Sequence, residues 1–201
     1  MAIKLEKAGD SHAINLNKAE VELPTVHINF DWEEVDQKRS SGFLGGLFGK
    51  SAKPDLDLGC MYEMQDGTKG VIQPLGGNFG SKNASPYIYL DRDDRTGATA
   101  GENLYIFRPD LIRRVLVFGF IYDGASDFQS VEGRMLFTTG TSEDIYLELD
   151  NPDAKRSFCV GAMITNRGSD LNITKEERYF EGHEAADRHY KFGFRWSAGS
   201  K

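Results

Sequence analysis

Acidic side chains gather at two places in the chain, and both could bind a cation. Asp55 and Asp57 stand two residues apart in DLDL, so on a strand both carboxylates point to the same side. The second group lies in LDRDDRTGATAGEN, residues 90–103, and offers oxygens from Asp91, Asp93, Asp94, Thr96 and Glu102. Calcium takes roughly six to eight oxygen ligands at flexible distances, and the glycines of this segment would let it wrap around an ion.

The same composition also fits a solvated acidic turn between two strands. The spacing is not that of an EF-hand, which needs ligands at alternating positions, a central glycine and a final glutamate. Carboxylates packed into so short a span repel one another unless a cation neutralises them or solvent separates them. A Ca²⁺ site and a solvated turn therefore both remain open from composition alone.

No arrangement for nucleophilic, zinc or phosphate-loop chemistry is evident. His183 and His189 are six residues apart, whereas a zinc-hydrolase helix needs two histidines four apart on one face. A phosphate-binding loop ending at Gly49-Lys50-Ser51 would need a glycine where Leu44 stands. We expect a protein that is not an enzyme. The alternative is an enzyme that acts on a metal, metalloid or nucleotide-like ligand at the acidic loop.

Strands are the elements that must position these side chains. Apolar residues alternate through 21–32, with one slip at 24–25, and again through 56–60, which is typical of strands with one buried face. The continuous apolar run at 113–122 predicts a central strand covered on both faces. Only 183–190 has a helical pattern. Further short strands are expected at MLFTTG, DIYLEL, SFCVGAMIT, LNITKEERYF and KFGFRWS. Many short strands separated by Gly- and Asp-rich turns predict an all-β sandwich or barrel in a single domain, residues 1–201.

One segment does not fit this pattern. Residues 37–54 are basic and rich in Gly and Ser, with an apolar centre, FLGGLF, and we expect them to form a long mobile loop. The apolar centre is a candidate docking point for a partner or a membrane surface. The alternative is that the segment folds back onto the sandwich.

Composition limits the partners and the compartment. The 201 residues carry a formal net charge of −7, which argues against nucleic acid as a partner, because binding a phosphate backbone requires clustered Lys and Arg. We expect no secretory signal, because the first ten residues lack an apolar region and a cleavage site. We also expect no transmembrane segment, buried core positions for Cys60 and Cys159, and a cytoplasmic location.

Several of these segments together resemble the TerD superfamily of tellurium-resistance and stress-response proteins, in its TerA-type branch. The resemblance rests on DLDLGCMYEMQDGTKGVIQPLG, LDRDDRTGATAGENLYI, IRRVLVFGFIYDG, RYFEGH and GFRWSAGSK. These segments cover most of the chain from about residue 54 onward. The combination of DLDL with a later D-D-R-T-G loop is more specific than either piece alone.

The resemblance implies a two-sheet antiparallel β-sandwich with one short helix near the C-terminus, and calcium bound by acidic loop residues. Asp55 and Asp57 match the family's F-D-L-D strand, and Glu102 matches the acidic end of its loop. Asp93, Asp94 and Thr96 match the D-N-R-T-G loop itself. Where the family has a run of acidic residues this sequence has ATAGEN, so the resemblance does not support a second calcium ion here.

The resemblance also implies a functional setting. It places the chain in a stress-response system as a binding or scaffolding component. The expected partners are calcium and other proteins of that system, including membrane-associated ones. The expected location is the cytoplasm, including the inner face of the membrane.

Overall fold

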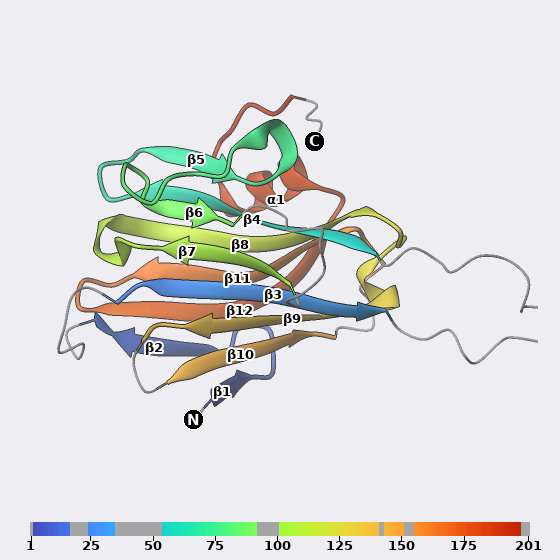
Figure 1. Ribbon diagram of the computed structural model, residues 1–201, viewed down its shortest axis with the longest axis horizontal. Helices are drawn as coiled ribbons and strands as arrows, with labels where there is room; N and C mark the ends of the chain where they lie inside the picture. The colour runs from blue at the N-terminus through green and yellow to red at the C-terminus, as the bar shows by residue number, and fades with distance from the viewer. Residues whose placement is uncertain are drawn as a thin grey trace, which may run out of the picture.

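The computed structural model describes residues 2–16, 24–34, 54–91, 101–140, 143–150 and 155–197. Within them, two sheets pack face to face around one apolar core, and the strands of the two sheets run in similar directions (Figure 1). The all-β class and the two-sheet sandwich are confirmed. Residues 37–53, most of the predicted mobile loop, lie outside the described residues.

The first sheet has six strands, and all neighbouring pairs are antiparallel except β1 with β10, which is parallel. Their spatial order is β1 (Ala2–Leu5), β10 (Asp144–Leu149), β9 (Val131–Thr138), β3 (Val26–Glu34), β7 (Glu102–Ile106) and β6 (Ile88–Leu90).

The second sheet also has six strands, all paired antiparallel. Their spatial order is β2 (Ser11–Asn15), β12 (Asp170–Phe180), β11 (Phe158–Asn166), β8 (Ile112–Asp123), β4 (Asp55–Met64) and β5 (Lys69–Ile72). The predicted central strand is β8, which lies between β11 and β4. A tight hairpin at Asp66-Gly67 joins β4 to β5.

The core between the sheets is built from the alternating positions of their strands. Leu56 and Leu58 of β4 and Ile28 and Phe30 of β3 are fully buried in it. Gly119 of β8 allows the sheets to approach closely, since a Cβ atom there would lie 2.8 Å from the Phe30 ring. The period of two in the sequence thus marks the residues that face the opposite sheet.

A second apolar cluster covers the outer face of the second sheet. It contains Phe118 and Phe120 of β8, Phe158 of β11, and residues of the helix α1 (His183–Tyr190) and of the segment that follows it. Figure 1 shows α1 and this C-terminal segment beside β4 and β5. β8 is therefore covered on both faces, as its continuous apolar run predicts. Among the described residues, no helix is long and apolar enough to cross a lipid bilayer.

The predicted strand KFGFRWS is wrong. Residues 192–197 join neither sheet and lie as an irregular strap over the second apolar cluster. The carboxylate of Asp187 in α1 accepts the backbone N–H groups of Gly193 and Phe194, at 2.7 and 2.9 Å. The alternating aromatic residues therefore pack on the sheet, while the backbone of the strap bonds to a side chain instead of to a neighbouring strand.

Candidate cation site

The start of β4 carries the first predicted pair of ligands. Leu56 and Leu58 point into the core, so Asp55 and Asp57, at the alternate positions, face the outer side of the second sheet. Asp57 is fully buried and Asp55 is partly buried. A carboxylate is costly to bury unless it is hydrogen-bonded, paired or bound to a metal, so the position of Asp57 requires specific compensation.

Glu102 approaches this pair from the other sheet. It is the first residue of β7 and not a loop residue as the sequence suggested, and it lies opposite Phe30 of β3. Its side chain is buried, and its Oε2 atom accepts a hydrogen bond from the backbone N–H of Leu58. The structure therefore brings Glu102 of the second predicted cluster next to the DLDL strand of the first.

The remaining predicted ligands are Asp91, Asp93, Asp94 and Thr96. Asp91 directly follows β6, its N–H donates to the carbonyl of Asn103 at 2.8 Å, and its side chain is exposed at the same end of the sheet as Glu102. Asp93, Asp94 and Thr96 fall in residues 92–100, which lie outside the described residues. Their roles stay predictions.

The sequence interpretation missed Asp123 as a member of this acidic end. Asp123 was not among the candidate ligands, but in the ladder between β4 and β8 it lies opposite Asp55. Like charges opposite one another in an antiparallel pair destabilise it, and a cation would relieve that repulsion. The sequence held only part of the signal: DLDL begins one strand and Asp123 ends the long apolar strand, but only the register of the ladder places the two side by side.

The described carboxylates do not complete a metal site by themselves. Within the described ranges, no group of three or more His, Cys, Asp or Glu side chains is arranged to hold a metal ion. The acidic end thus contributes side chains from β4, β7 and β8, and in the sequence residues 92–100 stand just before Gly101 and β7.

The two thiols are not part of this site. Cys60 and Cys159 are free and fully buried, as predicted. Burial raises the pKa of both thiols above the ordinary value for cysteine, so both stay protonated at neutral pH. A protonated, buried thiol is a poor nucleophile and a poor metal ligand.

Comparison with known proteins supplies a family. The tellurium resistance protein TerA of Alcaligenes sp is 36% identical over 201 residues, which covers 98% of this chain and 58% of that protein. TerX of Serratia marcescens is 31% identical over 116 residues, and TerZ of the same organism is 34% identical over 65 residues. These matches cover 51% and 32% of this chain, and 52% and 31% of the relatives. No family model matches the chain. The chain thus spans only about 58% of the length of TerA.

Proposed function

Since this chain belongs to the tellurium-resistance Ter family as a TerA-like member, we propose that it is a calcium-binding, non-catalytic component of a tellurium-resistance-type stress-response system. Its role in that system is to bind or scaffold other components.

The observation that best supports the calcium site is the position of Glu102 beside β4. Two buried carboxylates come from different sheets: Asp57 lies on β4, and Glu102 of β7 accepts a hydrogen bond from the backbone of the neighbouring Leu58. At the same end of the sandwich, Asp55 lies opposite Asp123. Negative charge concentrated at this end favours a bound cation. In the proposed site, Asp55, Asp57 and Glu102 supply oxygens from the strands, and Asp91, Asp93, Asp94 and Thr96 supply them from the loop.

Calcium fits this arrangement better than magnesium does. Calcium accepts a variable number of oxygens at about 2.3–2.6 Å, and strand and loop carboxylates can supply them without a fixed geometry. Magnesium requires a compact octahedron and gives up its water reluctantly. We therefore expect calcium to bind more tightly than magnesium.

The partners of the system follow from the family and from the basic, apolar segment at 37–54. We propose that other stress-response proteins, including membrane-associated ones, bind this chain. No observation on the described residues favours the alternative of an enzyme acting on a metal, metalloid or nucleotide-like ligand.

Calorimetric titration of chelator-treated protein with calcium and then magnesium tests the site. We expect saturable calcium binding and stabilisation of the fold, by about 2.7 kcal/mol at a hundredfold excess of calcium over Kd. Asp57→Asn should weaken binding. The matched control is Asp170→Asn, which removes a carboxylate at the opposite end of the second sheet and should leave calcium binding unchanged. Superimposable melting curves with calcium and with chelator would refute the proposal.

A further inference from the structure

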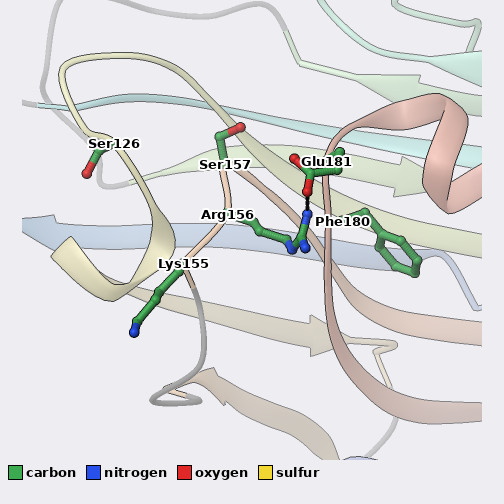
Figure 2. Close-up of a pocket in the computed structure, with 6 residues that line it drawn as sticks. All are labelled: Ser126, Lys155, Arg156, Ser157, Phe180 and Glu181. Carbon is green, nitrogen blue, oxygen red and sulfur yellow. Dashed lines mark ion pairs between the residues drawn. The ribbon is translucent and has the colours of Figure 1, made fainter.

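A pocket of about 420 Å³ opens where three distant segments meet. These segments are the β8–β9 connection, the residues just before β11, and the end of β12 (Figure 2). Its volume lies in the range of small-molecule sites. The lining residues are Ser126, Lys155, Arg156, Ser157, Phe180 and Glu181.

The walls of the pocket are held in place by backbone hydrogen bonds. The carbonyl of Arg156 accepts the N–H of Phe128, in the 3₁₀ turn Phe128–Ser130, at 3.1 Å. The carbonyl of Ser157 accepts the N–H of Ile121 of β8 at 2.8 Å. The Phe180 ring packs against His189 and Tyr190 of α1, with centroid distances of 5.5 and 6.0 Å. The pocket is therefore preformed.

Charge in the pocket is dominated by Arg156 and Lys155, with one carboxylate facing them. The Arg156 guanidinium forms an ion pair with Glu181, and Figure 2 shows these two side chains directed toward each other, with Ser157 near them and the Lys155 side chain directed away from the pair. The carboxylate of Asp127, which adjoins the lining residue Ser126, already accepts hydrogen bonds from the Ser130 N–H and the Ser126 hydroxyl. The pocket thus offers a guanidinium, an ammonium and hydroxyl groups to a ligand.

We propose that this pocket binds the phosphate group of a small anionic metabolite. When the ligand is absent, Glu181 forms the ion pair with Arg156. A guanidinium binds phosphate or carboxylate oxygens through parallel hydrogen bonds. A phosphate presents more oxygens than a carboxylate, and so can also accept from the Ser157 hydroxyl, while Lys155 adds positive charge to the pocket lining. The Arg156–Glu181 pair is solvent-exposed, with side-chain exposures of 42% and 78%, and exposed pairs contribute little to stability. A dianion can therefore displace Glu181 at small cost.

Inorganic phosphate is the probe, titrated into the full chain after calcium has been removed on a chelating resin. The backbone amide NMR signals of residues 155–157 and 181 report binding. We expect saturable shifts confined to these residues, affinity lowered by about tenfold or more in Arg156→Gln, and raised in Glu181→Gln, where the competing charge is gone. Arg188→Gln is the matched control, because Arg188 forms an exposed ion pair with Glu184 away from the pocket and should bind phosphate as the parent does.

Two further arms make the test decisive. Sulfate, titrated in the presence of calcium, should give the same pattern of shifts, which shows that the pocket does not depend on calcium removal. Acetate should bind clearly more weakly. Equal binding of acetate and phosphate would overturn the assignment of a phosphate ligand. Shifts that do not saturate, or that are the same in Arg156→Gln, would overturn the site itself.

Discussion

The carboxylate of Glu102 accepts a hydrogen bond from the backbone N–H of Leu58, and this contact joins β7 of one sheet to β4 of the other. β5 pairs only with Cys60–Glu63 of β4. On the same edge of β4, the N–H of Leu58 lies before this ladder and donates to Glu102 instead of to a strand. Glu102 therefore has two separable roles, as a hydrogen-bond acceptor between the sheets and as a negative charge at the acidic end.

Substitution of Glu102 separates these roles. In Glu102→Gln the side-chain oxygen still accepts from Leu58, so stability without calcium should stay close to that of the parent, while stabilisation by calcium should be lost. Glu102→Ala leaves a buried N–H without its acceptor and should lower the free energy of unfolding by about 1–3 kcal/mol with or without calcium. Denaturant unfolding in calcium and in chelator measures both effects. Full calcium stabilisation in Glu102→Gln would show that Glu102 is structural only.

A buried ion pair lies inside the sandwich at β12. Lys175 Nζ lies 2.9 Å from Glu177 Oε2 and donates to the carbonyl of Glu6 at 3.0 Å, and the Lys175 side chain is only 1% exposed. Removing one charge leaves the other buried, so Lys175→Met should cost about 3–5 kcal/mol of the free energy of unfolding. The double variant Lys175→Met, Glu177→Gln should recover most of that loss in the same denaturant experiment. Additive losses would contradict this view of the pair.

His183 should make stability depend on pH. Its ring packs against those of Phe118, Phe120, Phe158 and Trp196, and burial lowers its pKa from 6.5 to about 4. As pH falls below about 6.5 the unfolded chain binds a proton that the folded chain takes up only near pH 4. Stability is therefore lost across that window, by at most on the order of 3 kcal/mol.

The variant that tests this dependence is His183→Phe, since an aromatic ring suits the site and cannot titrate. The free energy of unfolding of His183→Phe should fall less steeply than that of the parent between about pH 6.5 and pH 5. His189→Gln is the control, because it removes an exposed histidine of the same helix and leaves His183 in place. Identical slopes for His183→Phe and the parent would show that His183 does not titrate differently in the two states.

The pattern of apolar residues along the chain predicted the fold better than it predicted the cation site. The continuous apolar run at 113–122 correctly predicted β8 as a strand covered on both faces, because apolar side chains on both sides of a strand must both be buried. The strap at 192–197 has the same alternation, but its backbone N–H groups donate to Asp187 instead of to a neighbouring strand. Asp187 reaches the strap only once α1 has formed. The pairing of Asp55 with Asp123 likewise depends on strand register, which no local pattern contains.

Asp187 provides the last prediction, since it fastens the strap to the body of the protein. It is 4% exposed and accepts hydrogen bonds from the backbone N–H groups of Gly193 and Phe194 and from Trp196 Nε1, the last at 2.9 Å. Asp187→Asn keeps the size of the side chain but places an amide NH₂ group opposite N–H donors. Each charge-assisted hydrogen bond that is lost should lower the free energy of unfolding by about 1.5–3 kcal/mol.

We expect Asp187→Asn to release the strap and to uncover the second apolar cluster, while both sheets persist. Trp196 fluorescence should shift to longer wavelength in a Trp32→Phe background, where Trp196 is the remaining tryptophan. Proteolysis should then cut near residues 192–197 faster than in the parent. Glu184→Gln, on an exposed position of the same helix, should change neither signal. Unchanged Trp196 emission in Asp187→Asn would mean that aromatic packing against Phe194 and His183 holds the strap without the carboxylate.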